Sequence, residues 1–367
     1  MLLKHRLKAF AISAVALAVL PLLLQGFGEA WVRILDTALL YILLALGLNI
    51  VVGFAGLLDL GYIAFYAVGS YLFALLASPH LVDNVPAIAA MFPNGLHSPF
   101  WAVIPLGAGV AAMAGVLLGA PTLKLRGDYL AIVTLGFGEI IRVFLNNLEA
   151  PVNITNGPKG ISSIEPIRLF GVSLGEPLHV AGFTLPSVTL YYYLFLAIVV
   201  VAVVICSRLH DSRLGRAWMA IREDEIAAKA MGLNTRNLKL LAFGLGATFG
   251  GVAGVLFASF QGFVSPESFS LQESVMVVAM VVLGGLGHIP GVILGAFLLA
   301  ALPEVLRHVA SPLQAMTDGR LDAAILRQLL VALAMIGIML MRPRGLWPSP
   351  RHEDRLIPDE EAAGGRA

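Results

Sequence analysis

The sequence predicts an all-α polytopic membrane protein with about ten transmembrane helices. Hydrophobic residues make up 58% of the 367 residues, charged residues make up 13%, and the mean hydropathy is +0.87. Soluble domains are only about 45–50% apolar and about 25% charged. The apolar residues form nearly uncharged blocks of about 20 residues, which is the length of helix that crosses a bilayer. Continuous blocks indicate helices, because barrel strands would show short alternating segments.

Ten apolar blocks mark the expected spans, with boundaries uncertain by a few residues. The eighth block is short and only His288 to Pro290 separate it from the ninth, so the two could form one broken helix or a re-entrant pair, and nine spans is the alternative to ten. The first block exceeds the apolar core of a typical signal peptide, so we expect it to be retained. The blocks lie at residues 9–25, 34–52, 62–78, 100–119, 129–148, 188–206, 240–258, 273–287, 291–309 and 322–341.

The distribution of basic residues predicts the orientation and the organisation of the chain. Under the positive-inside rule, the N-terminus (1–8), the loop 207–239 and the tail (342–367) face the cytoplasm, with a transmembrane domain at 9–341. The acidic tail is expected to be disordered. The opposite, periplasmic face carries the segment 149–187, where Pro and Gly residues predict hairpins or a short surface helix. The loop 207–239 holds seven basic residues: Arg208, Arg213, Arg216, Arg222, Lys229, Arg236 and Lys239.

Several classes of function are disfavoured by what the sequence lacks. The net charge of +1 provides no electrostatic basis for nucleic-acid binding. Cys206 is the only cysteine, so an internal disulfide framework and a cysteine-cluster metal site are excluded, and we expect no metal site. The pattern G-x-x-x-x-G-K-[ST] does not occur, so we expect no cofactor on this chain and no ATP held in a phosphate loop.

Glycine and polar residues inside the spans predict breaks, tight contacts and ion pairs. The segment with Asn49, Gly53, Gly56 and Asp59 is unusually polar for membrane depth, and we expect a broken helix that lines a pathway. Glycines at intervals of four predict close helix contacts. These are Gly246, Gly250 and Gly254; Gly287, Gly291 and Gly295; and Gly115 with Gly119. Two pairs of opposite charge, each three residues apart, are expected to be structural: Glu139 with Arg142, and Glu304 with Arg307.

The basic loop is predicted to contain one short helix, from about Trp218 to Met231, between Gly215 and a C-capping Gly232. Such a helix could insert into a groove of a partner protein. The alternative is a solvated loop whose charges only set the orientation of the chain in the membrane. The candidate contact residues are Arg222, Glu223, Asp224, Glu225, Ala227, Ala228 and Gly232.

The stretch from Ile226 to Gly232, IAAKAMG, resembles the Glu-Ala-Ala loop of ABC-importer permeases, in which a glycine follows four residues later. Ile226 occupies the position of the glutamate, and Glu225 is adjacent to it. Further stretches are similar to the LivM-type permease family of high-affinity branched-chain amino acid importers. They are Gly47–Tyr71, Gly127–Asn147, Thr155–Ile161 and Met280–Ala296, and the resemblance extends over roughly residues 34–347.

The resemblance implies a translocation subunit of the bacterial inner membrane that is not itself an enzyme. It implies a LivH-type second permease subunit, two ATPase subunits that bind ATP and magnesium at the cytoplasmic face, a periplasmic binding protein that delivers Leu, Ile or Val, and contact with membrane lipids. Three alternatives stay open. They are a permease for urea, short amides or a simple sugar; an ion-coupled secondary transporter titrating at Glu139, Asp59 or His288; and a channel.

Overall fold

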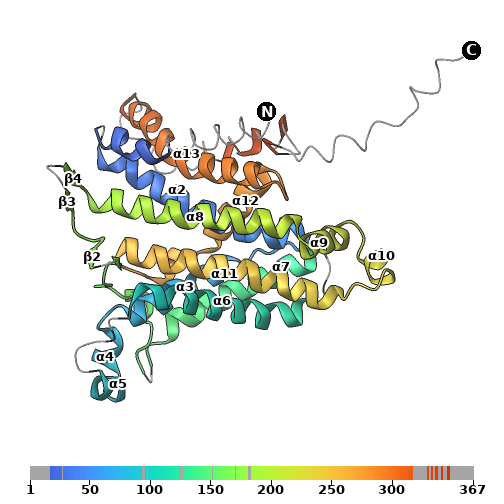
Figure 1. The fold of residues 1–367 in the computed structure, drawn as a ribbon, viewed down its shortest axis with the longest axis horizontal. Helices are drawn as coiled ribbons and strands as arrows, with labels where there is room; N and C mark the ends of the chain where they lie inside the picture. The colour runs from blue at the N-terminus through green and yellow to red at the C-terminus, as the bar shows by residue number, and fades with distance from the viewer. Residues whose placement is uncertain are drawn as a thin grey trace, which may run out of the picture.

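The structure is a computed structural model, and it is a bundle of long helices (Figure 1). Short helices α9 and α10 lie at one end of the bundle, and two small hairpins lie at the other (Figure 1). The described residues are 17–316, except 27, 93–95, 97, 124, 126, 151, 170, 181 and 182, together with 329, 332, 333, 335–337, 340, 341 and 345–347.

The elements follow the apolar blocks of the sequence closely. In chain order they are α2 (Glu29–Leu48), η1 (Asn49–Phe54), α3 (Ile63–Leu76), α4 (His80–Asn84), α5 (Pro86–Met91), α6 (Phe100–Thr122), α7 (Asp128–Asn147), η2 (Gly157–Lys159), β1 (Arg168–Leu169), β2 (Val172–Ser173), β3 (Leu178–Val180), β4 (Phe183–Leu185), α8 (Ser187–Asp211), α9 (Arg213–Glu223), α10 (Glu225–Ala230), α11 (Thr235–Gln261), η3 (Pro266–Phe269), α12 (Leu271–Gly284) and α13 (Ile289–Met316).

Six helices in the described part of the chain are long and apolar enough to cross a membrane. They are Glu29–Phe54, Phe100–Thr122, Ser187–Asp211, Thr235–Gln261, Pro266–Gly284 and Ile289–Leu306. Ile63–Leu76 is a shorter apolar helix. The expected span 129–148 is helical as α7 but is not among the six. The all-α membrane fold is therefore confirmed, whereas the count of ten and the orientation of the termini stay predictions.

Several expectations at the two ends of the chain fall outside the described residues. The N-terminus (1–8) and most of the tail (342–367) are among these, as is most of the block 322–341. Of the first block, residues 17–25 are described, and they are helical. The eighth and ninth blocks form two separate helices, α12 and α13, because Gly285 and Gly287 adopt positive φ angles of 111° and 81° in the turn between them.

Glycine packing at α11 holds the bundle together, as the spacing predicted. A Cβ on Gly254 would clash with the carbonyl oxygen of Tyr66 in α3. A Cβ on Gly246 would lie 3.0 Å from the carbonyl oxygen of Gly47 in α2, and one on Gly115 in α6 would lie 2.7 Å from the Cβ of Ala247. Between membrane helices such backbone approach replaces the hydrophobic driving force. Gly287 is the exception in its triplet, since it lies in the turn before α13.

Replacing Gly254 with alanine is expected to lower stability by about 1–3 kcal/mol, the cost of overpacking, because α3 and α11 must separate to admit a methyl group. The measurement is thermal unfolding of the purified protein in detergent. Gly109→Ala in α6 is the matched control, since nothing lies within 4 Å of the added Cβ. Equal midpoints for the two variants would contradict the close contact.

The segment 149–187 forms hairpins at the end of the bundle away from α9 and α10 (Figure 1). Strands β1 and β2 pair antiparallel, and so do β3 and β4. Backbone bonds join the segment to the bundle: Glu165 N donates to Ala77 O at 2.8 Å, and Ile161 N donates to Val264 O at 2.8 Å. The predicted hairpins are therefore present, and the chain that leads into them is bonded to residues just beyond the ends of α3 and α11.

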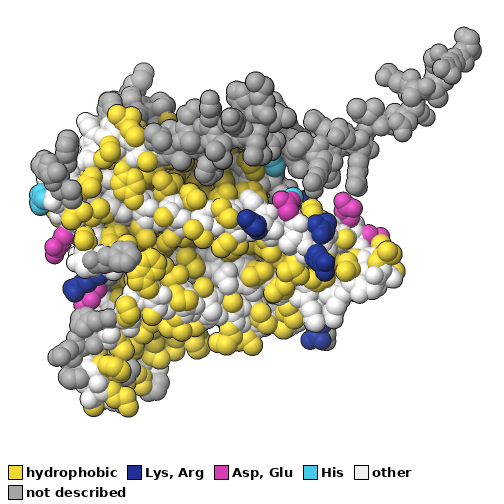
Figure 2. All heavy atoms as spheres, in the orientation of Figure 1, with side chains coloured by type: hydrophobic (Ala, Val, Ile, Leu, Met, Phe, Trp, Pro, Cys, Tyr) yellow, Lys and Arg dark blue, Asp and Glu magenta, His cyan; other side chains and the backbone are white. Residues whose placement is uncertain are grey.

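The outer surface matches a bundle that is surrounded by lipid. Figure 2 shows a mostly apolar face, on which the charged side chains gather towards the end formed by α9 and α10, with a smaller group at the opposite end. Large apolar side chains are exposed along α6 and α8, among them Trp101, Leu117, Val201 and Val204. Exposed apolar surface of this extent is unfavourable in water and favourable in hydrocarbon.

Candidate functional site: the α9–α10 loop and the helix break after α2

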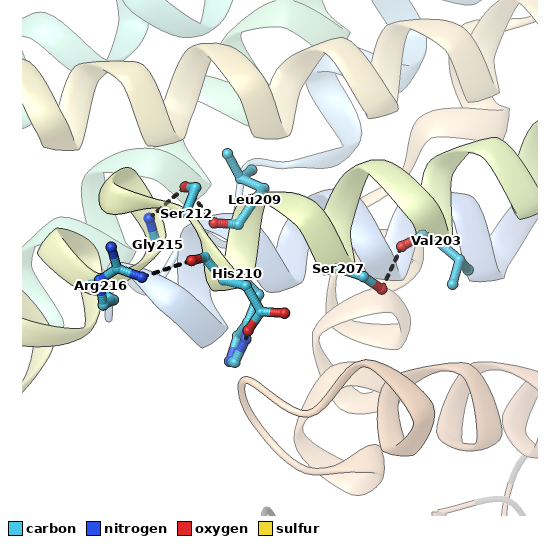
Figure 3. A network of polar contacts seen from close by, with 8 residues as sticks. Val203, Ser207, Leu209, His210, Ser212, Gly215 and Arg216 are labelled. Carbon is cyan, nitrogen blue, oxygen red and sulfur yellow. Dashed lines mark hydrogen bonds and ion pairs between the residues drawn. The ribbon is translucent and has the colours of Figure 1, made fainter. Parts of the chain in front are cut away.

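A closed turn connects α8 to α9 (Figure 3). The Ser212 hydroxyl donates to Leu209 O at 2.7 Å and accepts from Gly215 N at 3.2 Å, so it caps the first turn of α9. Arg216 Nη1 donates to Asp211 O at 2.7 Å. Gly215 thus lies inside α9, so the prediction that it bounds the helix is wrong. A Cβ at this position would clash with His210 O.

The prediction of one helix from Trp218 to Met231 is wrong, because the helix is interrupted at Asp224. Asp224 has an extended backbone with φ −153°, and its Oδ1 accepts from Ile226 N at 2.7 Å and from Ala227 N at 3.1 Å. Aspartate favours the N-cap because it satisfies amide groups that the first turn leaves free. Asp224 therefore ends α9 and starts α10 in a new direction.

Gly232 ends α10, as the sequence predicted. Its φ is +85°, its N donates to Lys229 O at 3.0 Å, and Leu233 N donates to Ala228 O at 3.1 Å. This bond pair is the Schellman motif, in which the residue after the helix takes a left-handed conformation. A side chain at Gly232 would meet nothing within 4 Å, so the constraint at this position is one of backbone conformation.

Glu225 ties α10 to the start of α11. Its carboxylate accepts from Lys229 Nζ at 2.9 Å, from Lys239 Nζ at 2.8 Å and from the Thr235 hydroxyl at 3.3 Å. Partial burial raises the pKa of Glu225, but the hydrogen bonds and charges of Lys239 and Lys229 outweigh it and lower the pKa to about 2. Nearby, Trp218 is fully buried and its Nε1 donates to Leu238 O at 2.7 Å. Together these contacts fix α9 and α10 against α11.

The stability contributed by Glu225 is expected to be lost only in acid. Its pKa in the folded protein, about 2, lies below the reference value of 4.5, so the contribution is complete above pH 4.5 and disappears as the pH falls through 2. Thermal unfolding of Glu225→Gln and the parent protein should therefore differ by a constant amount at neutral pH and converge in acid. Glu223→Gln, at an exposed position, is the control. A gap that is unchanged at pH 3 would contradict the assignment.

Arg222, in the last turn of α9, joins this loop to the break after α2. Its Nη1 donates to the carbonyl oxygen of Gly53. Its stem crosses Gly56, where a Cβ would lie 2.7 Å from Arg222 Cγ, and a Cβ on Gly287 would lie 3.1 Å from its Nη1. The two regions that the sequence marked separately, the basic loop and the glycine-rich segment, therefore meet at one side chain.

The break itself is a π-helix followed by irregular chain. Residues Asn49–Phe54 form η1, and Gly56 has a φ of +69°. Asn49 Oδ1 accepts from Gly287 N at 2.9 Å, and a Cβ on Gly53 would lie 2.7 Å from the same nitrogen. π-Helical turns are rare and often mark functional sites. The helix that begins at Glu29 thus ends inside the glycine-rich segment, and this end is held by the turn between α12 and α13.

Asp59 lies in the irregular chain beyond the break. It is 1% exposed, its Oδ1 accepts from Gly61 N at 2.9 Å, and its Oδ2 has no hydrogen-bond partner among the described residues. The neighbouring Leu60 N donates to the Thr134 hydroxyl of α7 at 3.0 Å. The loop is therefore packed against α7, and the expectation that Asn49, Gly53, Gly56 and Asp59 line a pathway stays a proposal.

The free side of α10 is apolar. Ile226 is 68% exposed and Met231 is 83% exposed, while Ala227 and Ala230 are exposed beside them. Ala228 points the other way and is buried. Spacings of three and four residues place side chains on one helix face, so the exposed members form a continuous apolar patch at the tip of the loop.

Of the two expected ion pairs, the structure describes one. Arg142 contacts Glu139 at 3.0 Å and also lies 3.7 Å from Glu267 of η3. The side chain of Arg307 lies outside the described residues, so its pairing with Glu304 stays a prediction. Among the described residues there is no cluster of three or more His, Cys, Asp or Glu side chains that could hold a metal ion.

Two buried charged residues, Lys239 and Asp36, were not identified from the sequence. Lys239 was counted only as a charge, yet it is buried against Glu225. Asp36 was not singled out, although an acid within an apolar block is a signal in itself. It is fully buried in α2, and neither carboxylate oxygen has a hydrogen-bond partner in the described part of the chain.

The long apolar helices define the class of multi-pass membrane proteins, and the family whose model matches the chain is one of transport permeases. The chain belongs to the branched-chain amino acid transport system / permease component family, whose model matches residues 30–340.

Relatives of this chain include two LivM proteins and a LivH protein. The chain is 42% identical to the high-affinity branched-chain amino acid transport system permease protein LivM of Escherichia coli, over 95% of this chain and 77% of that protein. It is 44% identical to LivM of Salmonella typhimurium, over 89% and 72%. It is 26% identical to LivH of the latter organism, over 71% and 79%. No solved structure matches the chain.

Proposed function

We propose that this chain is the LivM-type subunit of an ATP-driven importer of the bacterial inner membrane that translocates leucine, isoleucine and valine. A LivH-type permease completes the translocation pathway, a periplasmic binding protein delivers the substrate, and two ATPase subunits bind ATP and magnesium at the face that carries α9 and α10. The relatives LivM and LivH are named as permeases of high-affinity branched-chain amino acid transport, which supports the substrate class and the second permease. The missing phosphate loop supports a separate source of energy.

The observation that carries the proposal is the exposed apolar tip of α10 on a rigid base. An apolar helix face that is exposed at the polar end of a membrane bundle is suited to a groove of a soluble partner. Glu225, Lys239 and Trp218 hold the tip in a defined position. The tip is thus the proposed docking contact of the ATPases.

Arg222 is the proposed route from the ATPases to the membrane helices. Movement of α9 acts on Gly53 O, and therefore on the π-helix that continues α2. π-Helical turns are frequent at functional sites, so η1 is the proposed element that receives this movement. The loop transmits force, and this chain performs no chemistry.

Affinity purification of the tagged chain from membranes that express its transport system tests the assembly. We expect a second hydrophobic subunit and two ATPases to co-purify, and isolation of a lone species would overturn the proposal. Proteoliposomes that contain the complex and the binding protein should take up labelled leucine only with ATP. Unlabelled isoleucine and valine should compete, and urea and ribose should not; competition by urea alone would reassign the substrate.

A further inference from the structure

A cavity of about 80 Å³ lies between α2, α3 and α11, in the half of the bundle away from α9 and α10. Its lining combines one cation with aromatic and polar side chains, and those that carry the argument are Arg33, Tyr41, Tyr66, Phe257, Phe260 and Gln261. Gln261 is the last residue of α11 and is followed by the chain that pairs with the hairpin segment. In the proposed orientation, the cavity is thus near the end at which a delivered substrate enters.

Arg33 provides the positive end of this cavity. Its Nη2 donates to Gln261 Oε1 at 3.2 Å, and its guanidinium lies 5.3 Å from the centre of the Phe260 ring. Among the described residues it makes no ion pair. A guanidinium has five N–H donors in a fork that fits a carboxylate, so donors remain available for an anion.

Glu273 of α12 provides a negative group behind the cavity wall. The Tyr41 hydroxyl, which borders the cavity, donates to Glu273 Oε2 at 2.6 Å. Glu273 makes no ion pair with the described residues. Arg33 and Tyr41 are eight residues apart on one face of α2, about 12 Å along the axis, so the positive group is nearer the helix end and the negative group is deeper.

The wall between the two charged groups is apolar and rigid. Tyr66 is 7% exposed, and its ring centre lies 5.2 Å from that of Phe257 and 5.4 Å from that of Phe269. Aromatic contacts of this kind fix side chains in place and offer a flat apolar surface. Ligand sites typically combine such walls with a few convergent polar groups.

We propose that this cavity is a transit site for an aliphatic amino acid, with the carboxylate on Arg33, the branched side chain on the aromatic wall and the ammonium towards Tyr41 and Glu273. This inference rests on the proposed function and deepens it. The same helix continues into η1, whose Gly53 carbonyl accepts from Arg222. Substrate binding and the ATPase contact thus act on one element, α2, at its two ends.

The test is equilibrium binding of labelled leucine to the purified importer complex without its binding protein. Two competitors each lack one charge: isoamylamine lacks the carboxylate, and isocaproate lacks the ammonium. Arg33→Gln should weaken leucine binding about tenfold or more, since a hydrogen bond to a charged group is lost, and should leave isoamylamine binding unchanged. Glu273→Gln should weaken leucine and leave isocaproate unchanged.

Arg33→Lys keeps the charge and should bind leucine within a few-fold of the parent complex, which separates loss of charge from misfolding. Arg168→Gln, an exposed cation in β1 that does not line the cavity, is the matched control and should change nothing. Co-purification of all subunits checks assembly. The proposed site is refuted if Arg33→Gln leaves the affinity for leucine unchanged. It is also refuted if the substitution lowers the affinities for leucine and isoamylamine equally. ATP-driven leucine uptake by that same variant would then leave the proposed function intact.

Discussion

Replacing Arg222 with glutamine is expected to leave ATP hydrolysis by the assembled importer in place while leucine uptake per ATP falls by about tenfold or more. The magnitude follows from the loss of one hydrogen bond from a charged group, worth about 1.5–3 kcal/mol. Arg222 Nη1 donates to Gly53 O, and glutamine is too short to restore this bond across Gly56. The measurement is parallel assay of phosphate release and labelled leucine uptake in proteoliposomes.

Arg216→Gln is the matched control for this experiment. Arg216 belongs to the same helix, but it donates to Asp211 O at the end of the adjacent α8, and this bond does not reach the segment around Gly53 (Figure 3). Its replacement should leave the ratio of uptake to hydrolysis unchanged. If Arg222→Gln also kept the parent ratio, the transmission of force through Gly53 would be refuted.

The double substitution Ile226→Asp with Met231→Asp is expected to abolish co-purification of the ATPases. Burying two carboxylates in a groove that fits apolar side chains removes central contacts, which at interfaces cost about 2 kcal/mol or more each, or about thirtyfold in affinity. Both side chains are exposed in the isolated chain, at 68% and 83%, so its thermal stability should not change. The measurement is the yield of ATPase in affinity purification together with the unfolding midpoint.

Asn237→Asp adds one negative charge, half of what the double variant adds, at an exposed position near the start of α11 and outside the apolar patch, and it serves as the control. It should retain the ATPases. Equal retention by the double variant would place the docking contact elsewhere on the loop. Loss of ATPases by both variants would indicate general repulsion by negative charge.

The membrane fold could be predicted from the sequence because apolar blocks of bilayer length allow few other solutions. The blocks at 188–206 and 240–258 became α8 and α11, extended at both ends. Gly232 could be recognised as a helix end from its position alone, since a left-handed residue after a helix favours glycine. In contrast, Asp224 divided the expected loop helix, because its side chain satisfies the amides of Ile226 and Ala227 better than continued helix would.

The sequence by itself determined where the helices run and which short stretches break them, because hydropathy, glycine conformation and capping act within one turn of the chain. Only the tertiary structure decided that Arg222 contacts Gly53 and that Lys239 is buried against Glu225. The first of these contacts joins residues 169 positions apart. Such pairings depend on how the surfaces of different helices fit together, and no local pattern in the sequence encodes that fit.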